Sequence, residues 1–473
     1  MAENKVRGFG NPGRRDIAGK GIGMVAAESG IKAARPSTEG LGVREWKNTD
    51  ELKEARRQGN NLSRYARSGT PELEAAEEKA SGLLGLRREN VVAFAYGMTA
   101  VVAALECWRP RTVPKKSYCW PLRMVVAALE YWRPRTGLVA IHGRNEYSRI
   151  KQYFSDVLVP RGVLPVEVDS YSIEGLADTI EKRRPHIVFL ETVANGPDIP
   201  ILDVKRFLEI PYLKAPGLLI VLDNTLAADR IRPEELIGND LNTIVVESGT
   251  KFYTKNRSSV GFAYAKNPEI IARLRLLRTI TGGAPDRMPA KLLEEDIVGP
   301  DEFSHRNSRI FRNARTLAEL CASEVRPDSP FSVSYPNLAG HPNADFANER
   351  FPDGAAPLLF IRAKGNIDQY GITDALFSDP VIRDSCLVIE SFGFDFTAIY
   401  PNDYTPLDPK VKAAVYGSVN KTLIEPNDYT PLAPKGKEPF VRISAGAEDG
   451  EKAKEIGNAL RRGLRALSDI AGK

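Results

Sequence analysis

Two charged side chains stand at the ends of two apolar segments in the middle of the chain. The segment LLIVLDNT reaches Asp223, and the segment TIVVESGTK reaches Lys251. The run from Leu218 to Leu222 has the length and the β-branched content of a strand buried on both faces, as in parallel sheets. Ligands of open α/β sheets bind outside the carboxyl ends of the strands, so we expect both side chains to face one crevice. A carboxylate and an amine there predict a functional site.

Each of these side chains also has a simpler explanation. Lysine usually reaches solvent, and Lys251 becomes a useful nucleophile only if burial or a nearby cation lowers its pKa from about 10.4. Asp223 precedes Asn224, and an aspartate in such a place often caps a turn or a helix. These two segments alone leave both explanations open.

The composition is that of a globular protein with more than one domain. The chain has 473 residues, of which 42% are hydrophobic and 27% charged, and its net charge is +5. This small charge, with basic residues scattered along the chain, disfavours nucleic acid as a partner. Four cysteines without a Cys-x-x-Cys pair disfavour a metal site and a disulfide scaffold. No apolar run approaches the roughly 18 residues of a membrane span, so we expect a cytoplasmic protein without membrane contact.

Segments of strand length alternate with helical patterns after residue 137. Besides the strands that lead to Asp223 and Lys251, we expect strands in LVAIHG, LPVEVD, IVFLETV and GFAYA. Helices are expected at residues 71–84, 97–105, 172–184, 203–208, 268–277, 308–320 and 450–468. Strands that alternate with helices indicate βαβ units and a mostly parallel sheet with helices on its faces. The later segments APLLFIRA, SCLVIESFG and PFVRISAG indicate a smaller α+β domain.

We therefore predict three parts. Residues 1–64 form an N-terminal arm with at most one helix, near residues 50–57. Residues 65–300 form the large domain, and residues 301–473 form the smaller C-terminal domain.

Two short segments occur twice. VVAALECWRPRT at 101–112 returns with one change at 125–136, and PNDYTPLDPK at 401–410 returns with one change at 426–435. A solenoid needs at least about three stacked units, so these pairs are interpreted either as tandem insertions or as misassembled coding sequence.

Six motifs follow one another in a characteristic order. They are YARSGTPELE at 65–74, YGMTA at 96–100, LETVANGPDIPILDV at 190–204, VLDNTLA at 221–227, ESGTKF at 247–252 and FVRISAGAED at 440–449. As a set they resemble the Cys/Met metabolism family of pyridoxal-phosphate enzymes, the group of cystathionine γ-synthase and γ-lyase. The resemblance implies the aspartate-aminotransferase-like fold (PLP fold type I), with a mostly parallel large domain and a smaller α+β domain. It also implies pyridoxal 5'-phosphate as cofactor, an amino-acid substrate and a homo-oligomer, either a dimer or a dimer of dimers.

The resemblance gives individual residues roles. Lys251 would form the cofactor's Schiff base, and Asp223 would keep the ring nitrogen protonated. Further residues implied are Ser248, Thr250, Gly97 and Met98 at the phosphate, Asn195 beside the ring, Tyr65 and Arg67 at a neighbouring subunit's phosphate, Tyr147 as ring-stacking and catalytic tyrosine, Arg442 at the substrate carboxylate, and Thr397 at the substrate. A helix N-terminus and converging backbone N–H groups suit a phosphate. Without the resemblance, a turn glycine, a turn asparagine and a surface arginine are ordinary explanations for Gly97, Asn195 and Arg67.

Three departures from the family pattern bear on the substrate. Glu247 stands where the family has histidine, TKNRSS at 254–259 replaces its GGHSD turn, and Phe396 stands where cystathionine-handling members carry a glutamate. Cystathionine is therefore disfavoured. We predict γ-replacement or γ-elimination on an L-amino acid, at a C–O or C–S bond. A β-lyase and a non-catalytic relative that serves as a scaffold or partner subunit are the alternatives.

Overall fold

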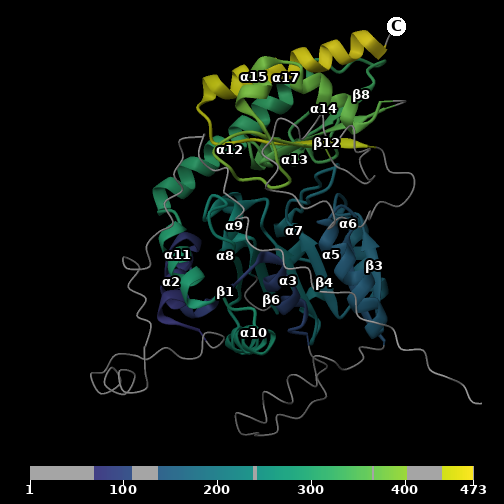
Figure 1. Ribbon diagram of the computed structural model, residues 1–473. Helices are drawn as coiled ribbons and strands as arrows, with labels where there is room; N and C mark the ends of the chain where they lie inside the picture. The colour runs from purple at the N-terminus through teal and green to yellow at the C-terminus, as the bar shows by residue number, and fades with distance from the viewer. Residues whose placement is uncertain (1–68, 109–136, 238–241, 365–366, 402–438, 472–473) are drawn as a thin grey trace, which may run out of the picture. The chain divides into compact units, whose positions relative to one another are not determined.

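The computed structural model describes five stretches of the chain, drawn as ribbon in Figure 1. They are residues 69–108, 137–237, 242–364, 367–401 and 439–471. The helix predicted near residues 50–57 and the second copy of each repeat lie outside these stretches. Within them, every helix is too short or too polar to span a membrane.

A seven-stranded sheet forms the centre of the large domain. Its strands are β1 (Val91–Phe94), β2 (Leu138–Gly143), β3 (Val163–Val168), β4 (Ile187–Glu191), β5 (Leu219–Asp223), β6 (Thr243–Glu247) and β7 (Gly261–Tyr264). Their order is β1-β7-β6-β5-β4-β2-β3. All neighbours are parallel except the two pairs that β7 makes with β1 and β6. The prediction of a mostly parallel sheet is confirmed, while β1 was not predicted.

Helices surround both sheets. They are α2 (Pro71–Leu84), α3 (Gly97–Leu105), α5 (Ser148–Tyr153), α6 (Ile173–Arg183), α7 (Val204–Leu208), α8 (Pro233–Leu236), α9 (Gly249–Phe252), α10 (Pro268–Thr281), α11 (Arg287–Asp296), α12 (Pro300–Ala322), α13 (Ala344–Arg350), α14 (Gln369–Phe377), α15 (Pro380–Ser385) and α17 (Gly450–Ala471). Local sequence explains where several of them begin. In α2, for example, the Thr70 hydroxyl accepts the N–H of Leu73 at 3.2 Å, and Pro71 takes the first helical position.

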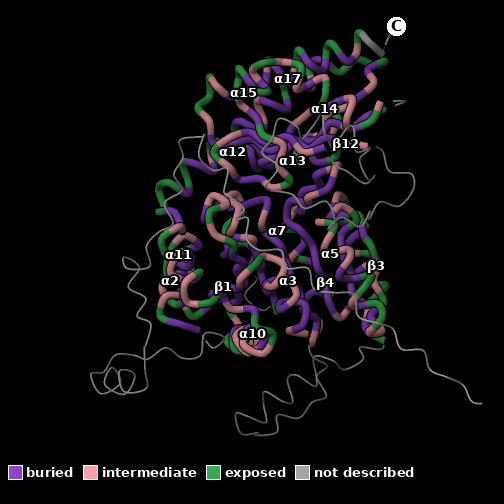
Figure 2. Tube along the Cα trace, in the orientation of Figure 1, coloured by how far each residue is buried: buried purple, intermediate pink, exposed green. Residues whose placement is uncertain are grey.

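Alternate residues of the central strands enter two apolar cores, one on each face of the large sheet. In β5, Ile220 and Leu222 belong to one core, and Leu219 and Val221 belong to the other. Figure 2 shows these strands in the buried interior and the outer sides of the helices exposed. Burial on both faces explains why the strands are continuous apolar runs rather than alternating ones.

A five-stranded sheet forms the second domain. Its strands are β8 (Phe331–Ser334), β9 (Leu358–Ala363), β10 (Leu387–Val388), β11 (Ala398–Pro401) and β12 (Phe440–Ser444), in the order β10-β11-β12-β9-β8. The strand predicted over SCLVIESFG is wrong in extent, because pairing stops at Val388 and the next residues form a loop. The long helices α12 and α17 pack side by side over this domain (Figure 1).

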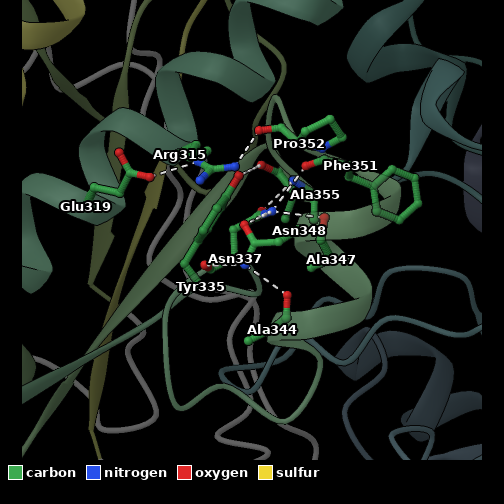
Figure 3. Close-up of polar contacts among 11 residues, drawn as sticks. Arg315, Glu319, Tyr335, Asn337, Ala344, Ala347, Asn348, Phe351, Pro352 and Ala355 are labelled. Atoms are coloured by element: carbon green, nitrogen blue, oxygen red, sulfur yellow. Dashed lines mark hydrogen bonds and ion pairs between the residues drawn. The ribbon is translucent and has the colours of Figure 1, made fainter.

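A buried asparagine fixes the connection between β8 and β9. The Asn337 amide nitrogen donates to the carbonyl oxygens of Ala347 and Phe351 at 3.0 and 3.1 Å, and its oxygen accepts the N–H of Ala355 at 3.0 Å (Figure 3). The amide nitrogen of Asn348, in α13, donates to the carbonyl oxygens of Asn337 and Ala344. The parts of this connection outside α13 therefore have a defined shape without regular secondary structure.

Candidate functional site

The carboxyl ends of β5 and β6 lie next to each other in the large sheet. The strands are parallel neighbours, and Asp223, the last residue of β5, pairs with Val246. The predicted strand up to Lys251 is wrong in extent, because β6 ends at Glu247 and the chain turns at Ser248 into the short helix α9. Lys251 therefore lies on a helical turn just beyond the sheet.

The Lys251 amine is enclosed by the loop that follows β10. Its Nζ donates to Oγ of Ser391 at 2.7 Å and lies 5.3 Å from the ring centroid of Phe392. Burial and, to a smaller extent, the nearby Arg442 lower its pKa to about 8, while Glu390 opposes the shift. About a tenth of this amine is therefore uncharged at pH 7, and this uncharged form is the one that a nucleophile or base requires.

The loop that carries Ser391 is held tightly against Lys251. Gly393 has φ of 77°, and a Cβ at this position would lie 2.6 Å from the carbonyl oxygen of Lys251. From α12, the Arg306 guanidinium donates to the Gly393 carbonyl oxygen and to Asp395 Oδ1, each at 2.6 Å. A side chain at position 393 would therefore push the loop and the lysine apart.

Two buried carboxyl groups lie at the ends of β4 and β5. Glu191 accepts the backbone N–H groups of Tyr147 and Asn195, each at 2.7 Å, and Asp223 accepts that of Thr225 at 2.9 Å. Burial raises the pKa of both carboxyl groups, and repulsion between them raises it further for Glu191. A cation placed beside Asp223 would relieve this unfavourable charge.

Glu146 adds a third buried carboxyl group, which was not predicted. It accepts the N–H of Gly143 at 2.5 Å, and burial and the charge of Glu191 hold its pKa well above the usual range. The only sequence feature that could have pointed to Glu146 is its place directly before Tyr147, a predicted site residue. The neighbouring His142 bonds the Gly143 carbonyl oxygen at 3.1 Å, which fits a structural histidine rather than a base. Among the described residues, no cluster of His, Cys, Asp or Glu side chains could hold a metal ion.

Glu247 has its own set of donors where the family pattern has histidine. Its Oε1 accepts the Asn224 amide at 3.0 Å and the Tyr264 hydroxyl at 2.7 Å, and its Oε2 accepts the Tyr253 hydroxyl. Burial raises its pKa to about 7. The network joins the turn after β5 to β7 and to the residue after α9, so it holds the segments that carry Asp223 and Lys251.

A cavity of about 450 Å³ is lined by residues of both domains. Tyr147 and Asn195 line it from the large domain and Arg442 from β12, while Lys251 and Asp223 are not among its lining residues. Lys251 interacts electrostatically with Arg442 and with Glu390, which also lines the cavity. Aromatic side chains of the small sheet complete one wall: Phe360, Tyr400 and Phe440.

The N-terminus of α3 faces the turn before α9. The helix begins at Gly97 after Tyr96, which provides no side-chain cap, so its first N–H groups are available to an anion. A Cβ on Gly97 would lie 2.9 Å from Cβ of Ser248, so helix and turn are in direct contact. Tyr65 and Arg67 lie outside the described residues, and their contact with a neighbouring subunit stays a prediction.

Three of the predicted site residues make structural contacts. The Thr250 hydroxyl donates to the Val260 carbonyl oxygen at 3.2 Å and accepts the Val260 N–H at 3.0 Å. Met98 packs against one of the two cores. Thr397 is fully buried, accepts the Gly446 N–H at 3.3 Å and does not line the cavity. The structure thus gathers Tyr147, Asn195 and Arg442 around the cavity and leaves these three outside it.

Comparison with known proteins agrees with the motifs. The model of the family described as Cys/Met metabolism PLP-dependent enzyme matches residues 131–374, just over half of the chain. An L-methionine gamma-lyase of Fusobacterium nucleatum is 27% identical over 201 residues, 42% of this chain and 48% of that protein. The cystathionine beta-lyase MetC of Bacillus subtilis is 26% identical over 297 residues, 63% of this chain and 66% of that protein. The chain thus matches about half the length of the first of these curated relatives and somewhat less than two thirds of the second.

Solved structures show the same fold. A crystal structure of cystathionine gamma synthase from Xanthomonas oryzae pv. oryzae in complex with cystathionine aligns over 86% of this chain and 90% of that chain, with 20% identity and a TM-score of 0.62. The structure of metB from Corynebacterium glutamicum gives a TM-score of 0.60. At this identity the likeness concerns the fold, and the predicted aspartate-aminotransferase-like fold is confirmed.

The residues present fit pyridoxal phosphate, the cofactor of the matching family. The buried Asp223 carboxyl group suits a protonated ring nitrogen, and the Lys251 amine suits an aldehyde. Asn195 Oδ1 is buried and finds no hydrogen-bond partner among the described residues, so a polar group is missing beside it. The N-terminus of α3 suits the phosphate.

Proposed function

Because the chain belongs to the family of Cys/Met metabolism PLP-dependent enzymes, we propose that it catalyses γ-replacement or γ-elimination on an L-amino acid, at a C–O or C–S bond. Pyridoxal phosphate is its cofactor. The observation that supports this proposal most strongly is the enclosed Lys251 amine, whose pKa is lowered to about 8, which donates to Ser391 and which interacts electrostatically with Arg442 and Glu390 of the cavity.

The residues of the proposed mechanism have distinct tasks. The cofactor, when bound, supplies an aldehyde that captures the substrate's amine and a ring that takes up electrons from its α-carbon. Arg442 binds the substrate's α-carboxylate with its planar fork of donors. Lys251 Nζ removes the proton from the α-carbon, and Asp223 holds the proton at the ring nitrogen. For a γ-leaving group, Lys251 then moves a β-proton, and the Tyr147 hydroxyl assists the departure.

The side-chain end of the substrate faces the aromatic wall of the cavity. Phe360, Arg442 and Tyr400 lie opposite one another on three neighbouring strands, so they share one face of the small sheet. A substrate held by Arg442 would place its side chain along this wall. Because Phe396 stands where the family pattern has a glutamate, a second charged amine at the end of the substrate is disfavoured.

β-Elimination is the second candidate. It uses the same lysine and needs one proton transfer fewer, and a relative in Bacillus subtilis carries the name cystathionine beta-lyase. A non-catalytic scaffold that retains the fold is the third, motivated by the altered turn at residues 254–259.

Absorbance and product analysis separate these candidates. The purified full chain should be yellow with pyridoxal phosphate, and Lys251→Ala should lose the bound chromophore. Incubation with O-acyl-homoserine, methionine, cystathionine or cysteine then gives a γ-cleaved keto acid, a new thioether or a β-cleaved product. A chain that stays colourless with added cofactor would support the scaffold.

We also propose that the protein is a cytoplasmic homo-oligomer, a dimer or a dimer of dimers, in which Tyr65 and Arg67 reach the phosphate of a neighbouring subunit. The proposed domains are residues 1–64, 65–300 and 301–473. Mixing Arg67→Ala protomers with Lys251→Ala protomers tests the shared site, because only a mixed dimer has one intact site. Sedimentation velocity gives the number of subunits.

A further inference from the structure

Asn256 lies in the turn that follows α9, close to Lys251. Lys255 and Asn256 both have left-handed backbone conformations, with φ of 53° and 61°. Asparagine adopts this conformation more readily than most residues, and here its N–H donates to the Thr250 carbonyl oxygen at 2.7 Å. The turn places its side chain beside the loop that carries Ser391.

The orientation of the Asn256 amide follows from its two contacts. Its nitrogen donates to the carbonyl oxygen of Phe392 at 2.9 Å. A carbonyl oxygen can only accept, so the amide cannot be turned the other way round. Its Oδ1 therefore faces Ser391, whose hydroxyl donates to it at 2.8 Å.

This orientation decides what Ser391 can do for Lys251. A serine hydroxyl can donate only one hydrogen bond, and Ser391 donates it to Asn256 Oδ1. Towards Lys251 Nζ, 2.7 Å away, Ser391 Oγ can therefore only accept. The charged groups that face the amine are Arg442 of β12 and Glu390 of the same loop. Both act on the amine through charge, whereas the hydrogen bond that Nζ makes is the one to Ser391.

We propose that Asn256 is a positioning residue: through Ser391 it fixes Lys251 as a hydrogen-bond donor and keeps the lone pair of the amine available for the aldehyde or for a proton. The use of this lone pair rests on the proposed function, whereas the direction of the hydrogen bonds does not. The contact comes from the TKNRSS turn, where the sequence departs from the family pattern.

Two substitutions of Asn256 should shift the pKa of Lys251 in opposite directions. In Asn256→Ala the Ser391 hydroxyl is free to donate to the neutral amine, so the pKa should fall by about half to one pH unit. In Asn256→Asp a carboxylate next to Ser391 favours the ammonium, so the pKa should rise by about the same amount. A loss of packing alone would shift it in one direction for both variants.

The pKa is measured on the full-length chain after removal of the cofactor. The rate at which trinitrobenzenesulfonate labels Lys251 is followed against pH, with the labelled peptide quantified by mass spectrometry. In a Ser391→Ala background, Asn256→Ala should have no further effect, because the connecting hydroxyl is absent. Asn348→Ala is the matched control: its amide bonds two backbone carbonyl oxygens, of Asn337 and Ala344, away from the site (Figure 3).

The results separate this proposal from the proposed function. Opposite shifts for the two variants, and no effect of Asn256→Ala without Ser391, support the relay. Equal shifts, no shifts, or an unchanged effect in the Ser391→Ala background overturn it. Adding pyridoxal phosphate to the same wild-type sample tests the function independently, since a chain that stays colourless refutes the function and leaves the labelling result valid.

Discussion

Gly393→Ala would disturb the contact between the 391–393 loop and Lys251 in a calculable way. Position 393 has φ of 77°, where an L-residue costs about 1–2 kcal/mol. The added Cβ would lie 2.6 Å from the Lys251 carbonyl oxygen and 2.9 Å from its carbon, both backbone atoms. Loop and helix must separate by about 0.8 Å to reach ordinary contact at 3.4 Å. This opening would lengthen the 2.7 Å bond between Lys251 and Ser391 to the limit of hydrogen bonding.

We expect two effects of different origin. The free energy of unfolding should fall by about 2–4 kcal/mol, from backbone strain together with the steric contact. The value of kcat should fall by about 100-fold, because a displacement of this size misplaces the reacting amine. Urea unfolding measures the first effect and steady-state kinetics the second. Borohydride reduction of the loaded protein followed by peptide mapping reports whether Lys251 still holds the cofactor.

Gly340→Ala is the control for strain alone. Gly340 has φ of 85°, and a Cβ there meets nothing within 4 Å. It should lose only about 1–2 kcal/mol of stability and keep its kcat. If both variants lose equal stability, and Gly393→Ala turns over at the wild-type rate, the argument from the close contact is refuted.

Four further predictions concern the charged groups of the site. Arg442→Lys should raise KM about 10- to 100-fold with unchanged cofactor absorbance, because an ammonium lacks the bidentate fork; an unchanged KM would argue against carboxylate binding. Asp223→Asn should retain cofactor but lower kcat about 100-fold or more, measured in single turnovers. Cofactor capture by the stripped protein should rise about fivefold from pH 7 to 8 and level off above about pH 9, since the pKa of Lys251 is about 8; a rise that continues to pH 10.5 contradicts this. The pKa of Glu247 is raised to about 7, so its stabilising contribution is present below pH 4.5 and lost as pH rises through 7. Glu247→Gln should therefore flatten the fall in unfolding free energy over this range, and parallel curves would contradict the assignment.

The sequence was informative wherever a residue's role depends on its near neighbours. Strands buried on both faces are apolar throughout, so β4, β5 and β6 were visible, and helix α3 begins at Gly97 as predicted. Asp223 at the end of β5 follows from the same pattern. The end of β6 at Glu247 could not be predicted from this pattern, because the single helical turn of α9 has too few residues to give a periodic signal.

Contacts between distant segments could not be predicted in this way. Lys251 and Ser391 are 140 residues apart, and Asn256 and Ser391 are 135 apart. The loop around Ser391 was included in a predicted strand over SCLVIESFG, whereas tertiary contacts with Arg306 and with Lys251 give the loop its shape. The buried charge of Glu146 likewise arises from packing that no local pattern encodes.

The departures from the family pattern are informative because one of them, the turn at 254–259, contacts the loop that carries another, Phe396. Asn256 belongs to the altered turn at 254–259, and its amide bonds Ser391 and Phe392, in the same loop as the altered residue Phe396. Glu247, the third departure, has three matching donors rather than an orphaned carboxyl group. Unselected changes in a site without function would leave buried polar groups without partners, at about 1–3 kcal/mol each. The matched contacts around Lys251 therefore favour a retained catalytic site over a scaffold.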